Sequence, residues 1–184
     1  MKKYVYLVLS FNIFISCNYY KLSKKNLLWQ PYMVGDKLVF KSNTEELDTI
    51  LISKINTVIS FTDNLSLFSD RHEVLFVDTP KQNVIEIKAL KKDMLLKFNI
   101  RLGKNKLYEE YPNIKVRLNE LIKMKCNNNI YCIETKYLID SISRYNSNIK
   151  NILWSNKLGY LKLVYNNEKS WELISFYRNN KKVY

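Results

Sequence analysis

Cys17 is the residue whose type and surroundings most clearly permit one specific chemistry. It follows an apolar run over residues 4–15 and a small residue, Ser16, and the chain becomes polar directly after it. Lys2 and Lys3 precede the run. This order is typical of a secretory signal peptide. A helix of about a dozen residues spans roughly 18 Å, well short of the ~30 Å hydrocarbon core, so a stable transmembrane helix is disfavoured.

The segment Phe14-Ile15-Ser16-Cys17 resembles a lipobox, the motif read by prolipoprotein diacylglyceryl transferase and lipoprotein signal peptidase. Phe14 departs from the usual leucine. We expect residues 1–16 to be a signal peptide that is removed, and the Cys17 thiol to carry a diacylglycerol. Two or three acyl chains would hold the chain stably on a membrane. The alternative is an ordinary signal peptide with a cysteine nearby by chance.

The residues after Cys17 are polar and include Lys21, Lys24 and Lys25. We expect residues 17–26 to be a lipidated cysteine and a polar tether that reaches up to ~30 Å when extended. No acidic cluster follows the cysteine, which favours the periplasmic side of the outer membrane. Residues 27–184 are expected to form one β-rich domain.

Most of the mature chain shows the period-two alternation of short strands. One example is Met94, Leu96 and Phe98 against Lys97 and Asn99. Turn-forming residues separate the segments, so we predict a mainly β fold with little helix, an antiparallel meander that forms one sandwich or open barrel. The expected strands cover residues 37–41, 47–55, 58–61, 73–77, 84–90, 94–100, 114–124, 130–141, 151–154, 160–165 and 170–177.

One of these segments allows a second interpretation. Residues 116–125 could form a helix, with Leu118, Leu121 and Ile122 as its apolar stripe. As a strand, the segment would place apolar side chains at even positions up to Cys126.

The chain has three cysteines, an odd number that lipidation of Cys17 would explain. Cys126 and Cys132 then remain in an oxidising compartment. The apolar positions are even before Asn127-Asn128-Asn129 and odd after it, so the two thiols should face opposite sides of a regular hairpin. We therefore expect no disulfide between them unless the turn is irregular. A zinc site is disfavoured because the chain has one histidine.

The sequence shows no arrangement of residues that is typical of a catalytic site. The single histidine, His72, lies in Asp70-Arg71-His72-Glu73, which favours a solvated salt-bridge group over an acid–base site. The carboxylates of Glu45-Glu46 and of Glu109-Glu110 point to opposite faces if extended. Three glycines leave little room for a phosphate loop. We expect no enzyme, no catalytic residue, no metal and no cofactor.

The formal net charge is +13, and loss of Lys2 and Lys3 leaves +11. Such a charge favours anionic surfaces, but the basic residues are spread along the chain, which indicates a solvated surface. Aromatic and basic residues alternate in Tyr160, Lys162, Tyr165 and Lys169, and again over residues 176–178. This could stack sugars or bases, but core and rim packing is the simpler interpretation. We expect no nucleic-acid partner for an exported chain.

Two segments resemble small lipoproteins of the Bacteroidota. They are residues 30–40 (QPYMVGDKLVF) and residues 152–162 (ILWSNKLGYLK), the latter followed by Trp171-Glu172-Leu173. The resemblance implies an envelope lipoprotein with a β fold, an opening strand after the tether and a closing hairpin. It implies no activity and no site residues.

The expected function is that of a membrane-anchored envelope lipoprotein with a non-enzymatic binding or structural role. Its partners would be the membrane, through lipid on Cys17, and a protein or a small apolar ligand. One alternative is a lipocalin-like carrier with an enclosed cavity. Others are a lipid-anchored immunity protein and an enzyme whose carboxylates are gathered by folding.

Overall fold

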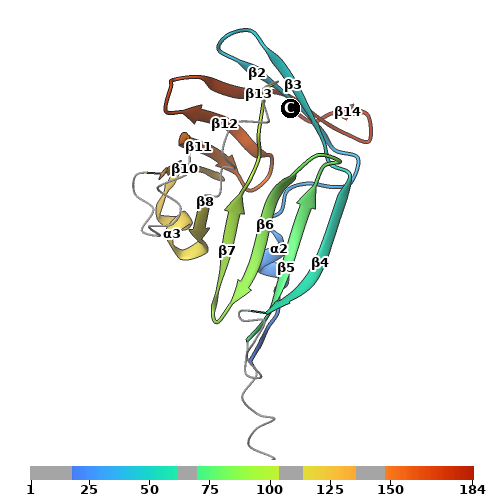
Figure 1. Cartoon of the computed structure of the whole chain (residues 1–184), viewed down its shortest axis with the longest axis vertical. Coiled ribbons are helices and arrows are strands. Elements are labelled where there is room, and N and C mark those ends of the chain that lie inside the picture. Colours follow the sequence, from blue (N-terminus) through green and yellow to red (C-terminus); the bar gives the residue numbers. More distant parts are fainter. Residues whose placement is uncertain (1–17, 62–69, 104–113, 136–147) are drawn as a thin grey trace, which may run out of the picture.

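The chain folds into two β-sheets packed face to face, as a computed structural model shows (Figure 1). The structure describes residues 18–61, 70–103, 114–135 and 148–184. Cys17, Glu109-Glu110 and the end of the strand expected at residues 130–141 lie outside these ranges. The mainly β prediction is confirmed, and the architecture is a sandwich rather than a closed barrel.

The first sheet, sheet A, holds six strands. Its main path is β1-β5-β6-β7-β8, and β4 pairs with the other edge of β5. The pairs β4–β5, β5–β6, β6–β7 and β7–β8 are antiparallel, whereas β1 runs parallel to β5. The strands are β1 (Tyr19–Tyr20), β4 (Lys54–Phe61), β5 (Arg71–Asp78), β6 (Asn83–Leu90), β7 (Asp93–Phe98) and β8 (Ile114–Arg117).

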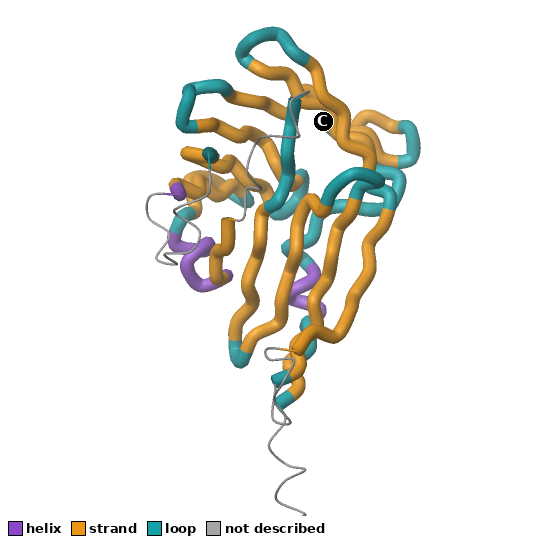
Figure 2. Tube along the Cα trace, viewed as in Figure 1, coloured by secondary structure: helices purple, strands orange, loops and turns teal. Residues whose placement is uncertain are grey.

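The second sheet, sheet B, holds eight strands in the order β3-β2-β13-β12-β11-β10-β9, with β14 paired to β13. Its strands run across those of sheet A in the view of Figure 2. The strands are β2 (Lys37–Ser42), β3 (Leu47–Leu51), β9 (Lys125–Asn127), β10 (Ile130–Glu134), β11 (Ile149–Ser155), β12 (Gly159–Tyr165), β13 (Ser170–Arg178) and β14 (Lys181–Lys182).

Alternating side chains fill the space between the sheets. In β7, Met94, Leu96 and Phe98 are buried while the residues between them are half-buried, as the pattern predicts, whereas Asn99, expected on the polar side, is buried. The Phe98 ring meets Trp154 of sheet B edge-on at 5.1 Å and Tyr160 at 5.8 Å. One continuous apolar cluster therefore joins both sheets and makes the described residues a single core.

Residues 47–55, expected as one strand, are divided between the sheets. β3 ends at Leu51 in sheet B and β4 begins at Lys54 in sheet A. Between them the Ile52 amide donates to the Asp36 carbonyl, and the Ser53 amide donates to the Asp78 carbonyl. These tertiary bonds turn the chain at a point where its own sequence has no turn signal.

The strand expected at residues 114–124 is wrong beyond Arg117. The helical alternative is realised as α3 (Leu118–Lys123), with Leu121 fully buried and Ile122 exposed. Side chains repeat with a different period in a helix than in a strand. The alternation of apolar residues before α3 therefore does not predict which side of the sheet the residues after α3 face. The second helix, α2 (Lys24–Leu27), begins at a capping box between Ser23 and Asn26.

Cys126 and Cys132 are joined in a disulfide with Cα atoms 5.8 Å apart, the outcome that was expected only for an irregular turn. In the β9–β10 pair, Asn127 lies opposite Ile130 and Lys125 opposite Tyr131, so Cys126 is the extra residue of a bulge. The irregular hairpin places both sulfurs on the exposed side of sheet B, where a regular one would have separated them.

Candidate functional site

The point where the lipid would be attached is defined by Asn18, the first described residue. Its carbonyl accepts from the Arg71 amide at 2.8 Å, and its side-chain amide donates to the Asp70 carboxylate at 3.0 Å. Asn18 therefore lies at the start of β5, at the tip of sheet A opposite the C-terminus (Figure 1). Cys17 itself lies outside the described residues.

The segment after Asn18 is folded onto the domain. Tyr19 and Tyr20 form β1 beside Arg71 and His72. The Tyr19 hydroxyl donates to Glu73 at 2.6 Å, and the Leu22 amide donates to the other carboxylate oxygen at 2.8 Å.

The tether expected over residues 17–26 is therefore corrected. β1 and α2 occupy most of its described part; α2 is capped locally by Ser23 and Asn26, whereas Tyr19 and Leu22 bind Glu73, which the local sequence does not reveal.

Two carboxylates hold this amino-terminal segment. The hydrogen bond from Tyr19, followed by that from the Leu22 amide, lowers the pKa of Glu73 from its ordinary value. The Asn18 side chain is the main cause that lowers the pKa of Asp70. Both carboxylates are thus stabilised in the charged form, which accepts hydrogen bonds best.

His72 is buried and not part of a solvated salt-bridge group, which corrects that expectation. It is 5% exposed and shares a face of β5 with Val74, opposite the face from which Leu75 and Val77 enter the core. Its Nδ1 lies 2.6 Å from the Ala89 carbonyl, which can only accept, so Nδ1 carries the proton. The ring packs against Tyr20 at 5.0 Å. Nδ1 is therefore occupied by the backbone, and Nε2 is buried without a hydrogen-bond partner in the described structure.

The acidic pair Glu45-Glu46 forms ion pairs instead of a catalytic couple. Glu46 binds Lys169 at 3.1 Å, and Glu45 pairs with Lys41. Within residues 18–61, 70–103, 114–135 and 148–184, no group of three or more His, Cys, Asp or Glu side chains could hold a metal ion.

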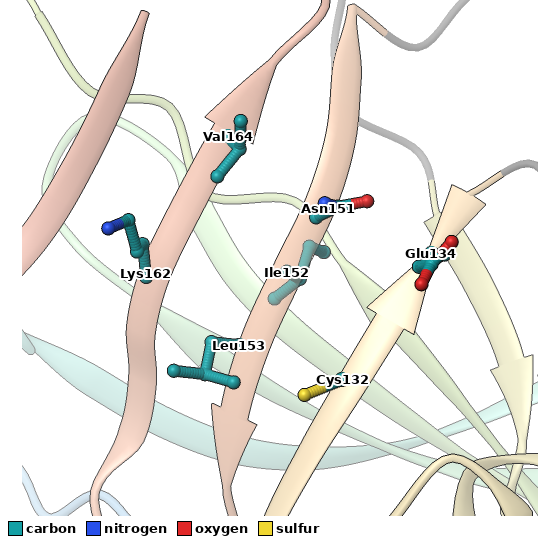
Figure 3. Close-up of a pocket in the computed structure, with 7 residues that line it drawn as sticks. All are labelled: Cys132, Glu134, Asn151, Ile152, Leu153, Lys162 and Val164. Atoms are coloured by element: carbon teal, nitrogen blue, oxygen red, sulfur yellow. The ribbon is translucent and has the colours of Figure 1, made fainter. Parts of the chain in front are cut away.

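A hollow of about 250 Å³ lies on the outer side of sheet B (Figure 3). Its floor comes from three neighbouring strands, β10, β11 and β12, and Leu153 lies between Lys162 and Cys132. The lining residues are Cys132, Glu134, Asn151, Ile152, Leu153, Lys162 and Val164. Lys162 also pairs with Glu172 at 3.4 Å, so the hollow combines an aliphatic floor with ionic edges.

Sheet B separates the aromatic residues of the alternating segment from its basic residues. Tyr160 and Tyr165 are buried, while Lys162 lies at the surface and Lys169 is drawn to Glu46. Lys169 also lies 5.4 Å from the Trp171 ring centre. The rings therefore belong to the core, as the packing interpretation predicts.

The sequence did not predict the ion pair between Asp36 and Arg178. Asp36 is 1% exposed and binds Arg178 through both carboxylate oxygens, at 2.9 Å and 2.6 Å. Arg178 also donates to the Pro31 carbonyl, and the Met33 amide donates to Asp36. The two residues are 142 positions apart, and only the antiparallel pairing of β2 with β13 brings them together. This cluster closes the end of the sandwich far from Asn18.

No protein-family model, no curated protein and no solved structure matches this chain. Among the described helices, none is long and apolar enough to cross a membrane.

Proposed function

We propose that this chain is a cell-envelope lipoprotein, held on a membrane by lipid on Cys17. The order of charge, apolar run, Ser16 and cysteine supports cleavage before Cys17. The observation that carries the proposal is this residue order, and the structure adds that Asn18, directly after Cys17, is hydrogen-bonded to Asp70 and Arg71. Cleavage before Cys17 would thus leave the whole described domain intact.

The proposed role of the domain is non-enzymatic, either binding or structural. His72 is buried with Nδ1 on a backbone carbonyl, and Glu45 and Glu46 form separate ion pairs. An enclosed carrier cavity has little support, because large aromatic side chains occupy the space between the described sheets. We place the anchor on the periplasmic side of the outer membrane, since no acidic cluster follows Cys17.

The test is metabolic labelling with a palmitate analogue in cells that express the full chain. Wild type should be labelled, should fractionate with membranes and should have lost residues 1–16 by mass. Cys17→Ser should lose the label and accumulate as uncleaved precursor. Cys132→Ser is the matched control, because it removes a thiol of the same chain and should keep the label. Equal labelling of wild type and Cys17→Ser refutes the proposal.

A further inference from the structure

The end of sheet A that carries Asn18 also gathers exposed cationic and aromatic side chains. Arg71 opens β5 directly beside β1 and opposite Phe61, the last residue of β4. The turn Lys91-Lys92 between β6 and β7 lies at the same end, because Ala89 contacts His72. Figure 1 shows this turn, the end of β4 and the start of β5 together at the lower tip of the sheet. We call the set Tyr19, Lys21, Phe61, Arg71, Lys91 and Lys92 the tip surface.

The basic side chains of the tip surface are exposed to solvent, whereas the nearby carboxylates accept hydrogen bonds. Asp70 and Glu73 bind the amino-terminal segment, and Asp93 accepts from the Met94 amide. Lys91 and Lys92 are exposed. These hydrogen bonds come from neutral donors and leave the formal charges unchanged, so the four basic groups of the tip surface exceed the three carboxylates by one positive charge, and both lysines of the turn are exposed.

Two exposed rings lie among these cations. Tyr19 is 43% exposed and Phe61 is 49% exposed. The Arg71 guanidinium lies 5.9 Å from the Phe61 ring centre, and Lys21 lies 5.2 Å from that of Tyr19. Aromatic rings beside basic groups suit the boundary between water and lipid head groups, where the ring enters the acyl edge and the cation stays with phosphate.

We propose that the tip surface docks onto anionic lipid head groups, so that the sandwich stands on the membrane with one fixed end down. The inference rests on the proposed function, because lipid on Cys17 would bring this end within one residue of the bilayer. Asn18 is itself hydrogen-bonded to the domain, so the domain would be held close to the lipid anchor. The ion pair of Asp36 and Arg178 then faces away from the membrane.

The fold supplies a matched control at its other end. Lys181 and Lys182 form a second exposed lysine pair, in β14, next to Arg178. Arg178 binds Asp36, whose carbonyl accepts from Ile52, and the following Ser53 binds Asp78 at the far end of β5. The eight residues of β5 separate the two ends by about 23 Å, more than twice the ~10 Å screening length at 0.1 M salt.

The experiment measures co-sedimentation of the chain from Asn18 onward, which contains every described element, with vesicles of phosphatidylcholine alone or with phosphatidylglycerol. The tip variant is Lys91→Gln with Lys92→Asn, since Lys92 has a positive φ that asparagine tolerates. The control is Lys181→Gln with Lys182→Gln, and thermal unfolding verifies that both variants fold.

We expect binding only to the anionic vesicles, weakened roughly 30-fold in the tip variant, because each basic residue at the surface contributes about fivefold. The control variant should bind within about threefold of wild type. Equal weakening in both variants, or no preference for anionic vesicles, overturns the inference. Cys17 is absent from this chain, so the result is independent of palmitate labelling and either proposal can fail alone.

Discussion

Glu73 joins the amino-terminal segment to the sandwich through one carboxylate that accepts two hydrogen bonds. The partners are a phenol, Tyr19, and a backbone amide, Leu22. Residue type alone suggested a solvated charge cluster over residues 70–73. Strand alternation divides that cluster instead, because His72 is buried on one face of β5 and Glu73 lies on the other, where it binds the amino-terminal segment. The partners of Glu73 lie more than fifty positions away, which is why its local sequence does not predict them.

This arrangement makes the docking of the segment pH-dependent. The pKa of Glu73 is lower in the folded chain than its ordinary value of 4.5, so its contribution is present above that value and is lost as the pH falls through the folded pKa. Hydrogen exchange at the Leu22 amide, corrected for intrinsic rates, should show protection that falls on acidification. Glu73→Gln should lower protection at neutral pH and remove the dependence. Unchanged protection of Leu22 in that variant would contradict the assignment.

The α3–β9–β10 unit shows how one element changes the faces of those that follow. Leu118 and Ile122 fit both a strand and a helix in the sequence, whereas Leu121 fits only the helix and packs into the core. The bulge at Cys126 then brings its sulfur beside Cys132. Periodicity predicted the strands well where it was uninterrupted, as in β6 and β7, and was wrong about the thiols where a helix and a bulge intervened.

Removal of the disulfide should have a modest and specific cost. The bridge closes a loop of six residue positions, for which chain entropy predicts a loss of roughly 2 kcal/mol in the free energy of unfolding. The chain from Asn18 onward with Cys126→Ser and Cys132→Ser should show this loss in urea. Reductant should reproduce the loss in the parent chain and leave the double variant unchanged. Rapid maleimide labelling of the native chain without reductant would show that the bridge is absent.

At the scale of the whole molecule, two consecutive hydrogen bonds connect Tyr32, sheet B and sheet A. The Tyr32 hydroxyl accepts from the Tyr160 amide at 2.9 Å, and the Tyr160 hydroxyl donates to the Val84 carbonyl of sheet A at 2.9 Å. Burial raises the pKa of both phenols far above their ordinary value, so both stay neutral, Tyr32 as the acceptor and Tyr160 as the donor of these bonds. Gly159 has a φ of +81°, and a Cβ there would overlap the Tyr32 hydroxyl.

Gly159→Ala should therefore lower the free energy of unfolding by roughly 2–4 kcal/mol, through backbone strain and displacement of Tyr32. Gly35→Ala is the matched control, because Gly35 also has positive φ but a Cβ there would meet nothing within 4 Å. The control should cost only about 1 kcal/mol. Urea unfolding measures both, and equal losses would show that the contact with Tyr32 has no energetic role.

The sequence by itself determined the features that depend on local order. These are the mainly β class, most strand positions, and the lipidation motif at Cys17 that remains a prediction. Tertiary structure decided which segments share a sheet, where the amino-terminal segment docks, and which distant groups meet, such as Asp36 with Arg178. The physical reason is the sequence separation over which each kind of interaction acts. Alternation and turn chemistry act over a few residues, whereas strand pairing, bulges and buried ion pairs depend on groups that only the folded chain brings together.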